Sequence, residues 1–141
     1  MEKERQIAIN ELTESDYLLV IVKDREIKYR SKDKGIRAIV GLLNNKPELL
    51  QEAVVADKVI GRAVAMICDY AQVKFCYGSI ISKSAIEILQ KADLSYQFKK
   101  KVEEIRNKND TGLCPVEKLT LKTDNSAEGI KMINDFLSDN C

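Results

Sequence analysis

Residues 53–64 read AVVADKVIGRAV, a short apolar run that meets a second apolar segment across two charged residues. The run 53–56 is small and β-branched, which is typical of a buried strand. From residue 58 to about residue 70, apolar side chains occur almost all round the helical wheel, which predicts a core helix. A strand followed at once by a helix indicates an α/β fold.

Asp57 and Lys58 lie at the predicted junction between this strand and this helix. Asp57 is expected to end the strand and cap the helix. Junctions of this kind commonly carry the site residues of α/β proteins, although a plain cap beside a solvated lysine explains the pair equally well. Gly61, in the first turns, lowers helix propensity by about 1 kcal/mol and indicates close approach of another backbone or of a ligand.

Working outward, strands and helices alternate along the rest of the chain. A helix over about 3–14 precedes a hairpin with strands 17–22 and 26–30, joined at Asp24-Arg25. The later predicted elements are a helix over 36–44, strands at 73–78 and 94–98 around a helix capped by Ser82 or Ser84, a charged short helix or loop over 99–109, a helix from Cys114 to about Leu121, and a helix over 127–137 capped by Ser126.

An antiparallel hairpin followed by strand–helix units predicts a mixed five-stranded sheet between helices, a three-layer α-β-α sandwich. The whole chain, 1–141, is expected to be one domain, with 122–141 as a C-terminal helical extension.

The stretch 111–118 reads TGLCPVEK, a glycine turn that feeds a helix. Gly112 suits a sharp turn, and Pro115 suits the first helical position, so Cys114 is expected at the N-cap. Glu117 then occupies the third helical position, where the acid of a capping box reaches back to the N–H of the cap residue. A thiol at this place faces free N–H groups and the positive end of the helix, which can lower its pKa. A small apolar residue that fills space at a helix start is the alternative.

Composition excludes several classes of function. The chain has 23 Lys and Arg against 22 Asp and Glu, a net charge of +1, so neither nucleic acid nor a membrane is favoured as a partner. Histidine is absent, which removes Ser-His-Asp and Cys-His catalysis and His-ligated zinc. The N-terminus is charged and no apolar run approaches the length of a membrane span, so a cytoplasmic protein with its four cysteines reduced is expected.

The order of elements resembles the cytidine-deaminase-like fold. In zinc deaminases one helix begins with H-x-E and a later one with P-C-x-x-C. Here the matching starts read Asp57-Lys58-Val59 and Cys114-Pro115-Val116-Glu117. The histidine is missing, and Glu117 stands in place of the second cysteine. The resemblance therefore implies the fold without its zinc and without hydrolytic deamination.

Three motifs carry a closer resemblance. Residues 35–37 (GIR), 54–65 (VVADKVIGRAVA) and 111–118 resemble a bacterial family of uncharacterised proteins, domain of unknown function 1893, from about residue 5 to about residue 121. The family brings no established activity, so the resemblance implies a deaminase-like fold and leaves the function open.

The first functional hypothesis is a site for a small anionic or nucleotide-like ligand where Asp57-Lys58 and Cys114 face each other at one sheet edge. Cys114 would be a nucleophile or acid and Asp57 a base or orienting group. The catalytic candidates are Cys114, Asp57 and Lys58, and the ligand-binding candidates are Arg37, Gly61, Arg62, Thr111, Gly112 and Glu117.

Two other hypotheses stand beside it. One is a non-catalytic binding or regulatory module, with a second copy of the chain as partner in a homodimer. The other is an atypical metal site made by Asp57, Cys114 and Glu117, a ligand set that suits zinc poorly. No resident metal or cofactor is expected.

Overall fold

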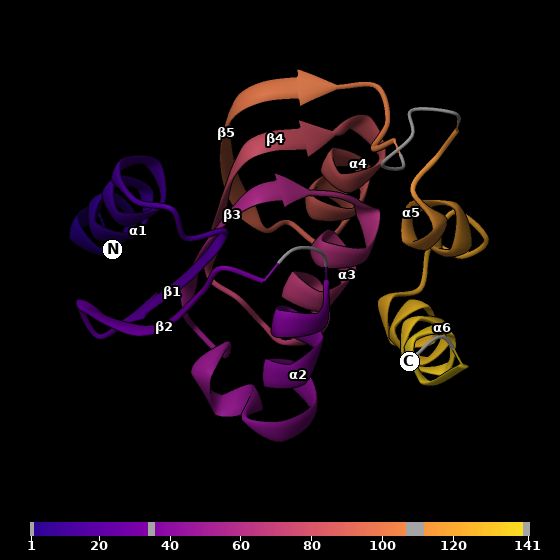
Figure 1. Ribbon diagram of the computed structural model, residues 1–141, viewed down its shortest axis with the longest axis horizontal. Helices are drawn as coiled ribbons and strands as arrows, with labels where there is room; N and C mark the ends of the chain where they lie inside the picture. Colours follow the sequence, from indigo (N-terminus) through magenta and orange to yellow (C-terminus); the bar gives the residue numbers. More distant parts are fainter. Residues whose placement is uncertain (1, 34–35, 107–111, 140–141) are drawn as a thin grey trace.

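A computed structural model describes residues 2–33, 36–106 and 112–139. These residues form a mixed α/β fold in which helices flank a five-stranded sheet (Figure 1). The strands are β1 (Leu19–Lys23), β2 (Glu26–Ser31), β3 (Val54–Ile60), β4 (Phe75–Ser82) and β5 (Ser95–Val102). The helices are α1 (Glu2–Glu14), α2 (Arg37–Asn45), α3 (Arg62–Tyr70), α4 (Lys83–Lys91), α5 (Pro115–Thr120) and α6 (Ser126–Asp139), with a short 3-10 turn at Pro47–Leu49.

The sheet has the order β2-β1-β3-β4-β5. β1 runs antiparallel to β2 and β3, whereas β3, β4 and β5 are parallel, so the predicted mixed sheet is confirmed. The hairpin turn is Asp24-Arg25, and both residues have positive φ (54° and 64°). Positive φ at both central residues matches the right-handed twist of the strands on either side.

Helices cover the two faces of the sheet unequally. On one face, Ala8 and Leu12 of α1 pack against strand side chains such as Val20, Val54 and Phe75. On the other face, α2, α3 and α4 form the larger core, and the buried Ile130 and Ile133 of α6 join it. α6 packs chiefly on α3, so the chain's last helix is anchored to the core. None of the helices in the described ranges is long and apolar enough to span a membrane.

β3 is longer than predicted, and this changes the position of Asp57 and Lys58. Both residues lie inside the strand, and the expectation that they begin a helix is wrong. Asp57 pairs with Leu19 of β1 on one side and with Gly78 of β4 on the other. Pairing on both sides outweighs the local preference of aspartate for a helix cap. α3 instead begins at Arg62, with Gly61 as its N-cap.

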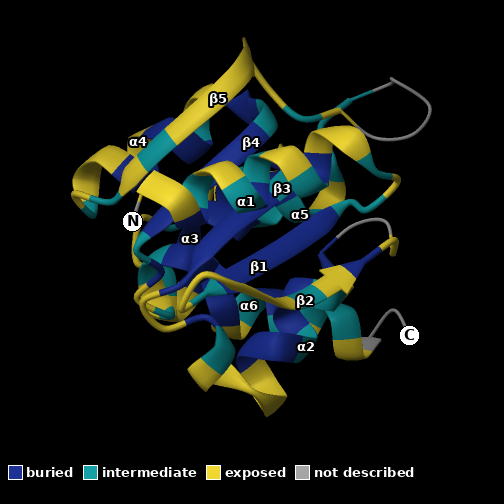
Figure 2. Cartoon of the chain, turned by 90° about the vertical axis from the view of Figure 1, so that its left-hand side faces the viewer, coloured by how far each residue is buried: buried dark blue, intermediate teal, exposed yellow. Residues whose placement is uncertain are grey.

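β5 is also longer than predicted, since residues 99–102 continue the strand and do not form a helix or loop. Lys99, Lys100 and Lys101 extend this edge strand, and Lys100 and Lys101 pair with Ile80 and Ile81 of β4. Figure 2 shows β5 exposed at the sheet edge, whereas β1 and the first half of β3 are buried. Exposed lysines on an edge strand oppose pairing with another chain.

Of the other predicted caps, besides Asp57, two are confirmed and one is wrong. Ser82 caps α4 by accepting a hydrogen bond of 3.1 Å from the N–H of Ala85, and Cys114 is the N-cap residue of α5. At the start of α6, the side-chain oxygen of Asn125 accepts a hydrogen bond from Glu128, whereas the predicted cap, Ser126, bonds to the carboxylate of Asp69. Thr111 lies outside the described residues.

Candidate functional site

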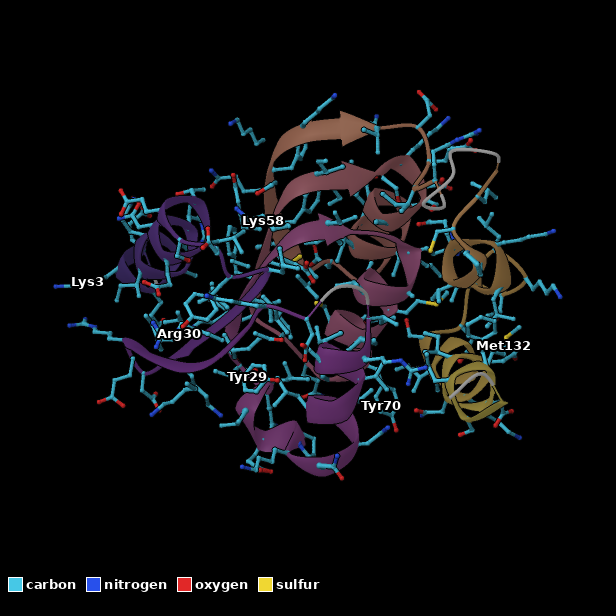
Figure 3. The ribbon with its side chains drawn as sticks, viewed as in Figure 1. Lys3, Tyr29, Arg30, Lys58, Tyr70 and Met132 are labelled. Atoms are coloured by element: carbon cyan, nitrogen blue, oxygen red, sulfur yellow. The ribbon has the colours of Figure 1, made fainter. Side chains whose placement is uncertain are left out.

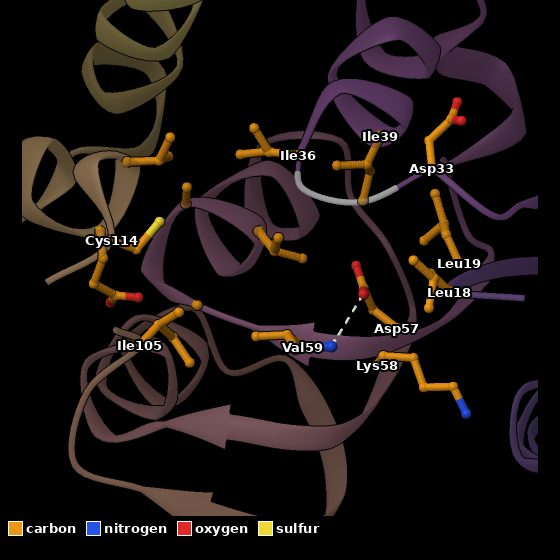
Figure 4. A pocket seen from close by; sticks show the side chains of 15 residues that line it. Leu18, Leu19, Asp33, Ile36, Ile39, Asp57, Lys58, Val59, Ile105 and Cys114 are labelled. Atoms are coloured by element: carbon orange, nitrogen blue, oxygen red, sulfur yellow. Dashed lines mark hydrogen bonds between the residues drawn. The ribbon is translucent and has the colours of Figure 1, made fainter. Parts of the chain in front are cut away.

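A pocket of about 380 Å³ lies at the carboxyl end of β3, beside the starts of α2, α3 and α5 (Figure 4). Its walls are largely aliphatic and are interrupted by three carboxylate side chains, those of Asp33, Asp57 and Glu117. The lining residues are Leu18, Leu19, Asp33, Ile36, Ile39, Asp57, Lys58, Val59, Gly61, Ala63, Val64, Ile105, Cys114, Val116 and Glu117. Apolar walls with a few polar groups are typical of small-molecule sites.

Asp57 is the main polar group inside this pocket. Its half-buried carboxyl group points into the cavity, and Oδ1 accepts a hydrogen bond of 3.1 Å from the N–H of Val59 (Figure 4). Burial removes water from the carboxylate and raises the pKa of Asp57 from 3.8 to about 7, against the opposing effect of hydrogen bonds from the N–H groups of Val59 and Lys58. A carboxyl group with this pKa can either donate or accept a proton near neutral pH.

Lys58 contributes no ammonium to the pocket. Its Nζ donates a hydrogen bond of 2.8 Å to the carbonyl oxygen of Leu12, in the last turn of α1. Figure 3 places Lys58 on the α1 side of the sheet. Successive side chains of a strand point to opposite faces of the sheet. Asp57 and Lys58 are neighbours in β3, so they do not face one ligand together, as was expected of a pair at a helix start.

Glu117 caps α3, and does not reach back to its own helix start as predicted. The buried carboxylate accepts the N–H of Arg62 at 3.1 Å (Oε1) and 3.3 Å (Oε2), and also accepts the Ser84 hydroxyl at 2.6 Å. The N–H of Cys114 donates instead to the carbonyl oxygen of Ile105 at 2.8 Å. The chain's own carboxylate thus fills the anion-binding start of α3.

Gly61 makes this arrangement possible. A Cβ at Gly61 would lie 2.5 Å from Oε2 of Glu117, so no other residue fits without displacing the carboxylate. The close approach predicted at Gly61 is therefore made by a carboxylate of the chain itself, at the pocket wall.

The two arginine candidates lie elsewhere. Arg62 is 4% exposed, and its guanidinium donates to the carbonyl oxygens of Thr120 (2.9 Å) and Thr123 (2.8 Å) and pairs with Asp124. This side chain therefore fastens the segment between α5 and α6 to α3. Arg37 is exposed at the first residue of α2, and neither it nor Gly112 lines the pocket.

Cys114 lies on the pocket wall, opposite Asp57. Its side chain is half-buried, and Figure 4 shows the sulfur directed toward the cavity. Cys68 and Cys76, by contrast, are fully buried in the core. The structure thus brings Cys114, Asp57 and Glu117 to one pocket, although they come from α5 and β3.

The donors near this pocket do not fit a metal ion. The chain has no histidine, and the described residues contain no group of three or more acidic or cysteine side chains able to hold a metal. Asp57, Cys114 and Glu117 therefore do not form the atypical metal site considered from the sequence. Glu117 is already engaged by N–H and hydroxyl donors.

Comparison with known proteins identifies the family of the chain. A sequence profile of a domain of unknown function, DUF1893, matches residues 7–137. The chain belongs to the DUF1893 family. The crystal structure of a DUF1893 family protein from Thermotoga maritima is similar to it with a TM-score of 0.88 and 24% identity, covering 96% of this chain and 90% of that chain. At this identity the likeness shows the fold alone. No curated protein matches the chain.

Sequence reasoning missed part of the pocket. Asp33 and Ile105 line it from segments whose local sequence carries no site signal, and Ile36 lines it from the motif at 35–37, which pointed only to the family. Asp33 lies in a polar loop, where an acidic residue is ordinary. Ile36 was predicted only as an apolar position at a helix start, and Ile105 only as part of the charged stretch 99–109.

Proposed function

We propose that this DUF1893 chain binds a small molecule in the pocket, with Asp57 as the group that orients it. The observation that carries the proposal is a half-buried carboxyl group, aimed into an apolar cavity of about 380 Å³, without an ion-pair partner among the described residues. A core made only for stability would not leave such a group beside an open cavity.

The charges around the pocket favour a neutral or cationic ligand. None of the three predicted cations offers its charge to the pocket: Lys58 bonds to Leu12, Arg62 bonds to the segment after α5, and Arg37 does not line the cavity. Glu117 already occupies the start of α3. The base of a nucleotide-like ligand, a flat polar ring with N–H groups, suits Asp57 better than the phosphate does.

The scaffold of this proposal is a deaminase-like fold without its metal. Zinc deaminases carry their catalytic motifs at two helix starts, and the two starts that correspond here, those of α3 and α5, lie beside this pocket. The poor fit to zinc removes hydrolytic deamination from the proposal, which is limited to binding and to chemistry that the side chains can perform.

Titration of the protein with cytidine, adenosine and the matching monophosphates, followed by amide NMR spectra, tests this ligand class directly. We expect the nucleosides to shift the amide signals of β3 and of the start of α3, and the monophosphates to bind about tenfold more weakly. Asp57→Leu should abolish the shifts, whereas Lys58→Met should keep them. Shifts that persist in Asp57→Leu, or monophosphates that bind better, would refute the ligand class.

Cys114 supports a second candidate, an enzyme with a cysteine nucleophile, because its sulfur faces the same cavity as Asp57 (Figure 4). This candidate predicts that iodoacetamide alkylates Cys114 faster than the chain's other cysteines near neutral pH, as measured by peptide mass spectrometry. The buried Cys68 and Cys76 serve as internal references. Slow labelling of Cys114, with normal ligand binding by Cys114→Ser, would instead favour a non-catalytic binding module.

A further inference from the structure

A second cleft, of about 430 Å³, lies at the opposite end of the sheet, where the parallel strands begin. Its walls come from α1 (Arg5), the start of β4 (Phe75), the end of α4 (Gln90), the turn that follows α4 (Asp93) and the start of β5 (Tyr96). It shares no residue with the Asp57 pocket. Its volume lies within the range of small-molecule sites.

Arg5 forms the positive side of this cleft. Its guanidinium carbon lies 4.1 Å from the centroid of the Phe75 ring, so the planar group is held against an aromatic face. Within the described part of the chain Arg5 makes no ion pair, and its buried Nε has no hydrogen-bond partner. A buried N–H without a partner is costly, so the Arg5 guanidinium has a hydrogen-bonding requirement that the described residues leave unmet.

Asp93 forms the negative side. It directly follows the C-terminal end of α4, where the partial negative charge of the helix adds to that of the carboxylate. No described cation pairs with Asp93. Between the two poles, the Tyr96 hydroxyl accepts a hydrogen bond of 3.1 Å from Gln90, which leaves its own proton free to donate.

We propose that this cleft binds a small zwitterion that carries an ammonium and a carboxylate on the same carbon, namely a free α-amino acid with an apolar side chain. The fork of N–H groups on Arg5 matches a carboxylate, and Asp93 with the end of α4 matches an ammonium. The apolar side chain would lie on Leu89, Leu94 and Phe75, which also line the cleft. A simple anion would be repelled by Asp93, and a simple amine by Arg5.

Calorimetric titration tests the proposal with three probes that differ only in charge. These are L-leucine, isocaproate, which lacks the amine of leucine, and isoamylamine, which lacks its carboxylate. We expect L-leucine to bind and each truncated probe to bind at least about tenfold more weakly. Amide NMR spectra should place the leucine-induced shifts at Arg5, Phe75 and the segment 93–96.

Matched variants test the separate contributions of Arg5 and Asp93 to the binding of leucine. Arg5→Met keeps an apolar contact with Phe75 and removes the charge, so the preference for L-leucine over isoamylamine should disappear. Asp93→Asn should remove the preference over isocaproate, and it keeps the local backbone because asparagine tolerates the positive φ of 56° found there. Lys3→Met, which removes the same charge from an exposed part of α1 directed away from the sheet (Figure 3), should change nothing.

The proposal fails if L-leucine produces no heat and no shifts at millimolar concentration, or if the truncated probes bind as well as leucine. It also fails if Arg5→Met and Asp93→Asn bind as the unchanged protein does. If Arg5→Met does not fold, Arg5→Lys replaces it, since a lysine keeps the charge but not the fork and should weaken leucine binding while leaving its preference over isoamylamine.

Discussion

Asp57 is the residue on which the candidate site depends, and its position in the pocket determines the pKa of its carboxyl group. A carboxyl group in water is ionised near neutral pH, but burial at the pocket floor raises the pKa of Asp57 to about 7. The folded protein therefore holds this proton more tightly than the unfolded chain does. The contribution of Asp57 to stability is fully present below the ordinary pKa of 3.8 and is lost as the pH rises through about 7.

Asp57→Asn removes this dependence. Because asparagine carries no charge to desolvate, we expect the variant to be more stable than the unchanged protein by about 1–3 kcal/mol at about pH 8, and to differ little at about pH 4. Urea unfolding at both pH values measures the difference. Asp33→Asn, at the exposed rim of the same pocket, is the control and should change little at either pH. A stability difference for Asp57→Asn that shrinks as the pH rises would contradict the cause assigned to the pKa.

A second prediction at the residue scale concerns the close contact between Gly61 and Glu117. Gly61→Ala would put a methyl group 2.5 Å from Oε2 of Glu117, so we expect a loss of about 1–3 kcal/mol in the free energy of unfolding. The loss should be much smaller in a Glu117→Ala background, where the clashing carboxylate is gone. Gly41→Ala is the matched control, since that position is in α2 with nothing within 4 Å, and it should stabilise by about 0.5–1 kcal/mol. Equal losses from Gly61→Ala in both backgrounds would show that the contact with Glu117 is not the cause.

At the scale of elements, Arg62 fastens α5 and α6 to α3. Arg62→Met leaves the carbonyl oxygens of Thr120 and Thr123 without their buried donor, so a loss of about 2–3 kcal/mol is expected. Amide hydrogen exchange should accelerate in α6 more than in the central strands. Asp124→Asn should cost less than about 1 kcal/mol, because the Asp124 side chain is 75% exposed. Uniform acceleration across the whole fold would mean that Arg62 supports global stability and not this attachment.

The elements also show how far the sequence predicts the structure. Periodicity and turn residues were sufficient for α1, the β1–β2 hairpin and the Cys114 cap, because these depend on neighbours along the chain. β3 and β5 were predicted too short, because Asp57 and the lysines of β5 are held in strands by pairing partners far away in sequence. Glu117 was assigned to its own helix because a capping box is a local pattern, whereas its actual donors are Arg62 and Ser84.

The candidate site divides in the same way. Asp57 and Cys114 were found from local motifs, and the fold brings them to one pocket. Lys58 and Arg62 were selected for their charge, but the direction of each side chain depends on tertiary structure that charge does not report. Arg5 and Asp93 had no local signal, because their cleft exists only where α1 meets the end of α4.

At the scale of the whole molecule, the described residues form a pocket at each end of the parallel part of the sheet. The Asp57 pocket lies where β3 ends, and the Arg5 cleft lies where β4 and β5 begin. Loops and helix ends meet at both edges of such a sheet, so cavities there can vary without disturbing the core.

The central claim, that the Asp57 pocket holds a small molecule, is tested most directly by native mass spectrometry of the protein purified from its own cells. The unchanged protein should carry a non-covalent mass that is released on unfolding, and Asp57→Leu should lose it. An unchanged protein found only at the mass of the bare chain, or an Asp57→Leu variant that retains the same added mass, would contradict the account.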